Sequence, residues 1–534
     1  MQTELIQKYQ NQINDSSLKI TNDHQITSFE FIKFLNVTKL NVSNQNSVDL
    51  KTVPENVKEL GIEESVIQEL KVENNFIVTL QLQYCQIQTI LQINAPQLVN
   101  LFLGGNQIEN IELISELTNL QILFLWQNKI KDIGGLQKLT QLKNINFMQN
   151  QIEDITTLKN MTQIQHIDIS KNKIQNINAL EQLTELEVIL CYQNNISDIN
   201  ALKNLTKLIY ISISKNQISD IRAISNLVNL QELYMDQNQI QDISAIKDCI
   251  QLKCISFCRN QINNIDCLQN LVELQDVRLN HNSIEDISVV EKLTKLIAFS
   301  AQNNKVSDLS SLANLKCLKL LHLFRNAVSD LRPLQNLSTL TELQLDDNKI
   351  NNIRPLSKLI NLKSLYLWYN QISDIQPLES LVNLNELVLE ENQIIDLSPL
   401  QNLTNLKVLR LKCNQICDVQ SLKNLTNLQI LILGLNFITD FAPVEAFEFF
   451  DSFYIAEQQV PSKELILKQK RMKTIYQMQK QIKKQFDNCG GVEKQVAEFK
   501  QHILSAHQTI LQQITTFVKK TAELLNSLEP NENQ

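Results

Sequence analysis

One asparagine returns every 22 residues through most of this chain. The pattern L-x-L-x-x-N-x-I places it at sixteen successive positions without an insertion, from Asn106 to Asn436. Asp or Asn follows each of these asparagines by four positions, from Asn110 to Asp440. Self-similarity at a fixed period of about 20 to 50 residues is the signature of repeat architectures. The chain is therefore not a set of independent globular domains, although its 534 residues would allow several.

A single unit shows why the repeats must stack. Leu365 and Leu367 alternate, so both point to one face of a short strand while Tyr366 points to the other. Asn370 ends the strand, where its amide can satisfy backbone groups in the turn. Asp374 caps the turn or short helix that carries the chain back along the convex side. No unit can bury its Leu/Ile face alone, so neighbours stack into a solenoid with one continuous core.

The repeat continues in a looser form at both ends of the regular block. Regular repeats occupy residues 101–461, and Gln458 replaces the asparagine in the last, capping repeat. Residues 40–100 hold irregular repeats at 20-residue spacing, with Ser65 and Cys85 in the asparagine position. Residues 1–39 form the predicted N-terminal cap. Terminal repeats are expected to be atypical because they present a polar surface to water.

These motifs resemble the leucine-rich repeat family. The 22-residue form is similar to that of the leucine-rich-repeat regulatory subunit of type 1 protein phosphatase and of the internalins, over about residues 18–460. The resemblance implies a curved solenoid of the α/β type, with a parallel β-sheet on a concave face that binds another protein. It also implies one class of partner, a phosphatase catalytic subunit.

The composition changes after Pro461. Residues 462–487 and 492–528 are predicted to be two helices joined by the turn signal at 487–491. The second carries apolar residues at coiled-coil spacing, so residues 462–534 are expected to form a helical hairpin. Between residues 463 and 484 the first helix has eight Lys/Arg against the single Glu464. This basic segment is one candidate ligand for the acidic repeats, and the hairpin is a candidate for self-association.

Composition excludes several classes of function. The 8 glycines are never spaced as in dinucleotide-binding or phosphate-binding loops, so no nucleotide cofactor is expected. A net charge of −8 argues against nucleic acid as a partner. No apolar run reaches the length of about 18 residues that spans a bilayer. With no secretory signal visible and 10 cysteines that we expect to be reduced, the chain is predicted to act in the cytoplasm or the nucleus.

Two groups of reactive residues are not expected to form catalytic or metal sites. His166, Asp168 and Ser170 share one strand face, but the first and last lie about 13 Å apart at about 3.3 Å per residue. That separation is too long for a nucleophile and its base. Four cysteines also cluster in sequence, but they take divergent positions on the repeat and so do not match the convergent ligands of a zinc site: Cys249, Cys254, Cys258 and Cys267.

Aromatic residues mark the concave face. Registering each repeat on its asparagine places Tyr366, Trp368 and Tyr369 at exposed strand positions. Carboxylates on the flanking repeats surround them and complete an acidic, aromatic-centred patch: Glu342, Asp346, Asp347, Glu386, Glu390 and Glu391. Phe124 and Trp126 hold equivalent positions nearer the N-terminus. Trp and Tyr are enriched among residues that anchor protein partners, so these eleven residues are the predicted partner-binding site.

The predicted function is a non-enzymatic, protein-binding scaffold that uses the concave face. A regulator of a type 1-like protein phosphatase is its concrete form by resemblance. The first alternative is a structural or oligomerising protein that acts through the C-terminal hairpin. The second is an enzyme such as a ubiquitin ligase with Cys489 as nucleophile, although Cys489-Gly490-Gly491 lacks the C-x-D motif of such ligases.

Overall fold

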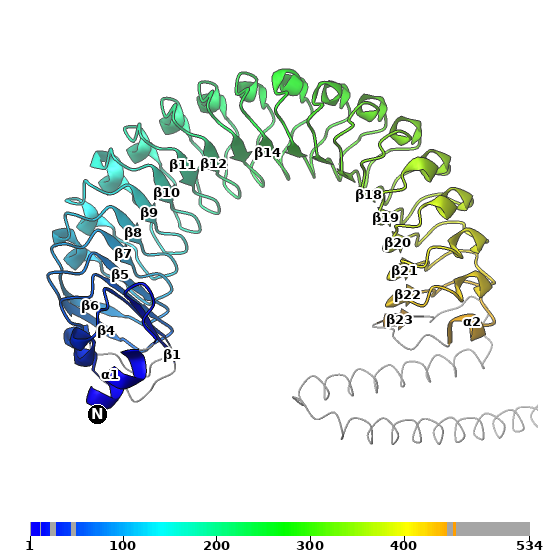
Figure 1. Cartoon of the computed structure of the whole chain (residues 1–534). Coiled ribbons are helices and arrows are strands. Elements are labelled where there is room, and N and C mark those ends of the chain that lie inside the picture. Colours follow the sequence, from blue (N-terminus) through cyan, green and yellow to red (C-terminus); the bar gives the residue numbers. More distant parts are fainter. Residues whose placement is uncertain (1, 11, 22–27, 44–49, 446–451, 455–534) are drawn as a thin grey trace, which may run out of the picture. The chain divides into compact units, whose positions relative to one another are not determined.

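The computed structural model describes residues 2–10, 12–21, 28–43, 50–445 and 452–454. It divides the chain into two units, Met1–Asp451 and Ser452–Gln534. The first unit is a solenoid whose strands line the inner side of a curve and whose short helices line the outer side (Figure 1). In the second unit only β23 (Ser452–Tyr454) is described, so the predicted hairpin at 462–534 lies outside the described residues.

One strand from nearly every coil joins a continuous parallel sheet. It begins with five-residue strands, β1 (Ser17–Thr21), β2 (Lys39–Ser43), β3 (Glu59–Glu63) and β5 (Thr79–Gln83). Three-residue strands then continue it, each paired in parallel with the next: β7 (Asn100–Phe102), β8 (Ile122–Phe124), β9 (Asn144–Asn146), β10 (His166–Asp168), β11 (Val188–Leu190), β12 (Tyr210–Ser212), β13 (Glu232–Tyr234), β14 (Cys254–Ser256), β15 (Asp276–Arg278), β16 (Ala298–Ser300), β17 (Leu320–His322), β18 (Glu342–Gln344), β19 (Ser364–Tyr366), β20 (Glu386–Val388), β21 (Val408–Arg410) and β22 (Ile430–Ile432). The L-x-L motif predicts strands at 101–103, 123–125 and onward, and the observed strands begin one residue earlier, at Asn100 and Ile122.

The outer side of the regular coils is built from 3-10 helices rather than α-helices. They are η3 (Glu112–Glu116), η4 (Gly134–Leu136), η5 (Thr156–Asn160), η6 (Asn178–Leu180), η7 (Asn200–Leu202), η8 (Arg222–Ile224), η9 (Ser244–Ile246), η10 (Asp266–Asn270), η11 (Ser288–Lys292), η12 (Ser310–Leu312), η13 (Arg332–Leu334), η14 (Arg354–Lys358), η15 (Gln376–Ser380), η16 (Ser398–Leu400) and η17 (Gln420–Leu422). A short α2 (Ala442–Glu445) follows them. A coil of 22 residues leaves room for one tight helical turn between strands.

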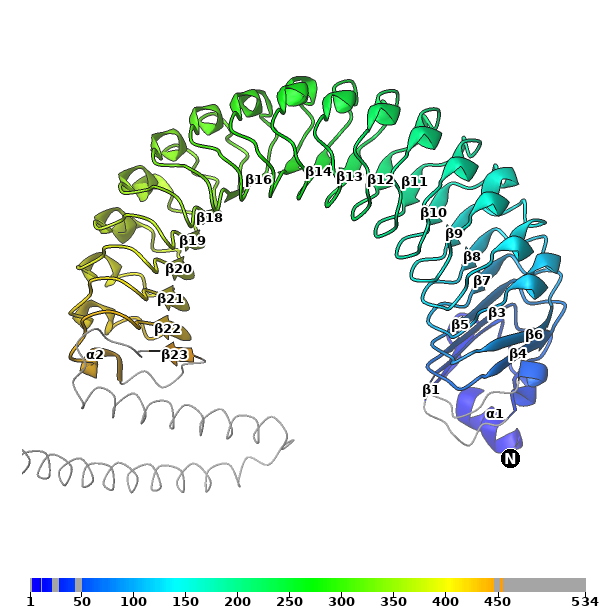
Figure 2. The same cartoon turned by 180° about the vertical axis from the view of Figure 1, so that it is seen from behind.

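The early coils differ on their outer side. There β4 (Glu69–Glu73) and β6 (Thr89–Asn94) pair in a second, two-stranded parallel sheet, visible on the far side of the first coils in Figure 2. Two 3-10 helices precede it, η1 (Glu30–Phe34) and η2 (Leu50–Thr52). At the start of the chain α1 (Gln2–Gln10) packs on η1, where the rings of Tyr9 and Phe31 lie 5.9 Å apart.

The core confirms the predicted strand faces. Leu365 and Leu367 are fully buried, while Tyr366 stays partly exposed on the inner surface. Five further apolar residues of the same coil are also buried and stack on their equivalents in the neighbouring coils: Ile372, Ile375, Leu378, Leu381 and Leu384. The hydrophobic effect therefore holds the coils together along a single seam.

The recurring asparagine joins each coil to the one before it. The Asn370 amide donates to Leu367 O at 3.2 Å and Trp368 O at 3.2 Å, as the pattern predicts, and also to Leu345 O of the preceding coil at 3.0 Å. Its oxygen accepts a hydrogen bond from the preceding coil's Ile350 N. The residue that precedes each regular asparagine has a positive φ, 52° at Tyr369, so the strand ends in a left-handed turn.

The Asp or Asn four positions later caps the outer helix, which confirms the prediction. Asp374 Oδ1 accepts a hydrogen bond from Gln376 N at 2.9 Å, at the first residue of η15. Asparagine does the same at Asn110 and Asn176. Either side chain presents the oxygen that the exposed N–H group at the helix start requires.

Candidate functional site

The predicted aromatic patch is assembled on the inner surface around β19. Tyr366 is the last residue of that strand, and Trp368 and Tyr369 follow it. The ring centres of Trp368 and Tyr369 lie 6.0 Å apart at an angle of 56°. Tyr369 is 53% exposed, because the left-handed turn points its side chain away from the core. These rings therefore lie on the inner surface, outside the apolar core.

A carboxylate from the preceding coil holds the backbone beneath Trp368. Asp346 Oδ1 accepts a hydrogen bond from Trp368 N at 2.7 Å. Burial raises the pKa of Asp346 to about 6, and the nearby charges of Glu390 and Asp347 add to that rise. The hydrogen bond from Trp368 acts in the opposite direction, since it stabilises the ionised form.

The side chain of Tyr366 is held by the following coil. Its hydroxyl donates to Glu386 Oε2 on β20 at 2.7 Å. Desolvation raises the pKa of Tyr366, and its hydrogen bond to Glu386 raises it further. The phenol therefore stays protonated and serves as a hydrogen-bond donor at neutral pH.

Three of the six predicted carboxylates already contact basic side chains of this chain. His322 Nε2 lies 3.0 Å from Glu342 Oε1, and Arg325 Nε donates to Asp347 Oδ2 at 3.0 Å. Arg410 lies 3.1 Å from Glu390, a carboxylate that is only 8% exposed. The sequence comparison covered only the coils directly beside Trp368, and these three basic residues lie two coils away from it. Each is one coil from the carboxylate that it contacts, and the row shared by Arg325 and Asp347 was the available signal.

Glu391 completes the patch and differs from the other carboxylates. It is exposed at a left-handed turn with φ 51°, and it forms no ion pair within the described part of the chain. Charged, partly neutralised and aromatic side chains therefore share one surface across β17 to β21. A rim of this kind around exposed aromatic rings suits protein recognition better than catalysis.

Phe124 and Trp126 form a second aromatic cluster that the structure does not bring to the first. Trp126 lies over Gly104, where an added Cβ would meet its ring at 2.1 Å. The ring centre of Tyr84 lies 5.3 Å from that of Trp126, and Phe102 and Phe124 meet edge-to-face at 5.1 Å. Eleven coils separate the two tryptophans along the sequence.

The residues considered for catalysis or metal binding have other contacts. His166 Nδ1 lies 2.9 Å from Asn144 Oδ1, and Asp168 accepts a hydrogen bond from Ser170 N at 3.0 Å. Cys249 is fully buried, and desolvation raises the pKa of its thiol to about 11. In the described residues no group of three or more His, Cys, Asp or Glu side chains is arranged to hold a metal ion.

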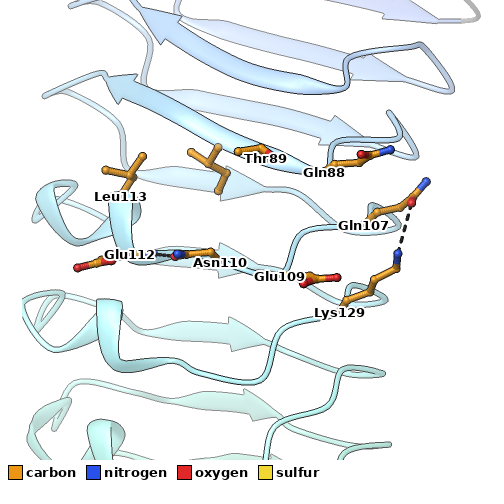
Figure 3. A pocket seen from close by; sticks show the side chains of 9 residues that line it. Gln88, Thr89, Gln107, Glu109, Asn110, Glu112, Leu113 and Lys129 are labelled. Atoms are coloured by element: carbon orange, nitrogen blue, oxygen red, sulfur yellow. Dashed lines mark hydrogen bonds between the residues drawn. The ribbon is translucent and has the colours of Figure 1, made fainter.

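A surface hollow of about 620 Å³ lies where the early coils give way to the regular ones (Figure 3). Thr89 of β6 and Leu113 of η3 line it, and Lys129 Nζ contacts Gln107 Oε1 at 3.4 Å on its rim. Asn110, also on its wall, accepts the hydrogen bond from Glu112 N that caps η3. None of the predicted site residues lines this hollow.

Comparison with known proteins agrees with this geometry. The family model "Leucine Rich repeats (2 copies)" matches residues 118–160, 206–248, 338–380 and 382–424. This chain is a leucine-rich repeat protein. No curated protein sequence matches it.

Solved structures share the leucine-rich repeat fold. A Leptospira interrogans LRR protein is 24% identical, with a TM-score of 0.59 over 64% of this chain and 91% of its own. The Arabidopsis receptor kinase HAESA, solved with the peptide hormone IDA and the co-receptor SERK1, is 20% identical, with a TM-score of 0.60 over 83% of this chain and 85% of its own. An internalin from Listeria monocytogenes is 32% identical over 59% of this chain and 85% of its own, with a TM-score of 0.48. No described helix of the present leucine-rich repeat protein has the length and apolar character needed to cross a membrane.

Proposed function

We propose that this protein is a non-enzymatic scaffold whose inner surface binds a protein partner through the patch around Trp368. The observation that carries the proposal is the pair of neighbouring rings, Trp368 and Tyr369, standing on a strand end that Asp346 fixes. Because this backbone is held before binding, a partner loses little conformational freedom of the patch when it docks. Large, rigid aromatic side chains then supply most of the contact energy.

Solved proteins with this fold support a protein or peptide as the ligand. HAESA is described in complex with a peptide hormone, and the plant receptor RGFR1 in complex with RGF2. The patch of the present chain favours a basic segment of the partner, since Asp346, Glu386 and Glu391 form no ion pair in the described residues. Carboxylates on the rim accelerate the association of such a segment, and salt weakens the effect.

The concrete partner that we propose is the catalytic subunit of a type 1-like protein phosphatase. The 22-residue form of the repeat supports it, through its resemblance to the regulatory subunit of that enzyme. We place this function in the cytoplasm or nucleus, the compartments in which thiols such as those of Cys85 and Cys249 stay reduced.

Capture with the intact chain tests the scaffold. Bound proteins are quantified for the wild type, for Trp368→Ala and for the control Phe76→Ala, which removes an exposed ring from an early coil. We expect Trp368→Ala to reduce capture of the specific partner at least about tenfold, in line with an aromatic hot spot, and Phe76→Ala to leave it unchanged. Equal capture by all three proteins would show that the patch is ordinary surface.

Two further measurements separate the finer versions of the proposal. Titration with purified phosphatase catalytic subunit tests the named partner, and an absence of binding rejects it. Sedimentation of the intact chain at low and high salt tests the alternative in which the basic C-terminal segment joins copies of the chain. A monomer at both salt concentrations rejects self-association and leaves the scaffold proposal standing.

A further inference from the structure

A second charged feature runs along the inner surface, away from the Trp368 patch. It consists of the residues directly before the recurring asparagine in five successive coils. Cations and glutamines alternate in this set, which we call the Lys/Gln column: Lys171, Gln193, Lys215, Gln237 and Arg259.

The backbone of the Lys/Gln column is rigid. All five residues lie in the left-handed region, with φ between 53° and 57°. Each N–H group donates to a carbonyl of the following coil, as Lys215 N does to Asp236 O at 2.7 Å and Arg259 N does to Asn280 O at 2.7 Å. The side chains therefore project from fixed turns, and four of the five are exposed, Lys171 being partly covered.

The cations of the column are not neutralised by this chain. Within the described residues neither Lys215 nor Arg259 forms an ion pair, in contrast to Arg325 and Arg410 at the Trp368 patch. Lys171 lies over the ring of Tyr192, 5.7 Å from its centre, and forms no ion pair. Burial lowers the pKa of His281, and the charges of Arg259 and Arg325 lower it further. Positive potential therefore extends past the end of the column.

The spacing of the cations specifies the shape of a ligand. Lys171, Lys215 and Arg259 are separated by 44 residues each, which is two coils. Neighbouring strands lie about 4.8 Å apart, so successive cations lie about 10 Å apart. Three residues of polyproline II helix advance about 9.3 Å and return the side chain to the same side. In a β-strand, positions three residues apart face opposite sides, so a strand does not fit.

The glutamines complete the match. Gln193 and Gln237 stand between the cations, and each carries a donor and an acceptor. A polyproline II segment makes no internal hydrogen bonds, so its peptide groups are free to pair with them. Nucleic acid fits less well, because the column offers only three unpaired cations and the whole chain has a net charge of −8.

We infer that the Lys/Gln column binds an extended, acidic segment of a protein, in polyproline II conformation, with carboxylates at every third residue. The inference rests on the proposed function, since it adds a second contact for a partner on the same inner surface. Carboxylates at positions i, i+3 and i+6 pair with Lys171, Lys215 and Arg259. The main-chain amides between them pair with Gln193 and Gln237.

Fluorescence anisotropy on the intact chain tests this inference with defined probes. The first is a labelled peptide of about twelve residues repeating Glu-Ala-Pro, which presents one carboxylate per turn. The second replaces each glutamate with glutamine, and the third has the same composition with the glutamates adjacent. A single-stranded oligonucleotide of equal charge is the fourth. Binding is measured at low and high salt.

Matched variants locate the binding. Lys215→Glu with Arg259→Glu reverses two charges of the column, and Lys247→Glu with Lys292→Glu makes the same change on the outer side, where both lysines are exposed. We expect the Glu-Ala-Pro peptide to bind at least about tenfold tighter than the other peptides, with an affinity that falls as salt rises. The column variant should lose that preference, and the outer variant and Trp368→Ala should keep it.

Three results would overturn the inference. Equal binding of the glutamate, glutamine and clustered peptides removes the spacing argument. An equal loss in the outer variant reduces the effect to overall charge. Tighter binding of the oligonucleotide assigns the column to nucleic acid instead. Each result is independent of the capture experiment with Trp368→Ala, so the scaffold proposal can stand or fall separately.

Discussion

The early coils, which contribute β2, β3 and β5, and the regular coils that follow share one inner sheet but differ in polar chemistry. In the regular coils an asparagine amide reaches a carbonyl of the preceding coil, as Asn128 Nδ2 reaches Leu103 O at 2.9 Å. In the early coils Cys85 Sγ reaches the equivalent Ile62 O at 3.3 Å, and Ser65 Oγ bonds to Glu63 O of its own coil. The sulfhydryl is a weak donor, and a serine hydroxyl has one donor hydrogen where the asparagine amide has two.

The length of strand pairing also differs between the early and the regular coils. Strand β2 pairs with β3, and β3 with β5, over five residues each, while the regular strands pair over three. The early coils also pair β4 with β6 on their outer side, where the regular coils carry 3-10 helices. Beyond the strands, main-chain hydrogen bonds join the coils in both regions, as Leu125 N bonds to Asn146 O and Glu64 N to Gln83 O. Both regions share the apolar stack, so a comparison of the two isolates the contribution of the polar links.

The largest expected effect comes from removing one asparagine in the middle of the array. Asn260→Leu deletes hydrogen bonds to Met235 O at 3.0 Å and Phe257 O at 3.1 Å and leaves Ile240 N without its acceptor. Unsatisfied buried groups cost about 1–3 kcal/mol each, so we expect a loss of about 3 kcal/mol of unfolding free energy. Urea unfolding measures it. Asn263→Leu, at an exposed site of the same coil, is the control.

If Asn260→Leu shifts the urea midpoint no more than Asn263→Leu does, the asparagine does not link the coils. The contrast between the early and the regular coils would then reduce to strand length alone.

A second polar link between regular coils is sensitive to pH. The folded-state pKa of Asp346, about 6, lies above the ordinary value for aspartate, so the folded protein favours the protonated form. Stability from this group is present below about pH 4 and is lost as the pH rises through 6. We expect Asp346→Asn to raise the unfolding free energy at pH 7 by about 1–2 kcal/mol, at about 1.4 kcal/mol per pKa unit reduced by remaining solvent contact.

The gain from Asp346→Asn should disappear at pH 4, where the wild-type side chain is neutral in the fold. Asparagine already does this work at Asn280, whose oxygen accepts a hydrogen bond from Gln302 N at 2.8 Å. Paired urea midpoints at pH 7 and pH 4 measure the difference. A gain of the same size at both values would show that burial of the charge is not its cause.

We expect a smaller loss of unfolding free energy when the polar link of an early coil is removed. Cys85→Ala removes a buried thiol and its bonds to Ile62 O and Gln83 O. Because sulfur bonds weakly, we expect a cost of about 1 kcal/mol, most of it from the small cavity. Urea unfolding compares it with Cys317→Ala, which removes an exposed thiol. A cost that matches that of Asn260→Leu would break the distinction between the two regions.

The smallest effect concerns the outer helices, which the early coils replace by β4 and β6. Asp374→Ala removes the acceptor for Gln376 N, and such caps contribute about 0.5–1 kcal/mol. Asp374→Asn is the control, since Asn110 and Asn176 cap their helices in the same way. Thermal unfolding should separate the two variants. Equal melting points for both variants would show that the recurring cap oxygen has no role in stability.

Much of the fold and the composition of the patch could be predicted from residue spacing. A period of 22 with alternating leucines requires stacked coils, because no other arrangement buries Leu365 and Leu367 on one side and leaves Tyr366 on the other. The cap at Asp374 was also predictable, because its partner lies two residues away. The outer strands β4 and β6 were not, because coils without the regular motif give no periodic signal for that side.

By itself, then, the sequence determined the repeat, the buried face, the local caps and which residues share a row on the inner surface. Only the tertiary structure decided that Asn370 bonds to the preceding coil, that Arg325 and Arg410 neutralise Asp347 and Glu390, and that the turns before the asparagines are left-handed. The physical reason is the reach of the contacts. Local hydrogen bonds depend on neighbours along the chain, whereas contacts between residues 20 to 25 apart depend on how one coil settles against the next.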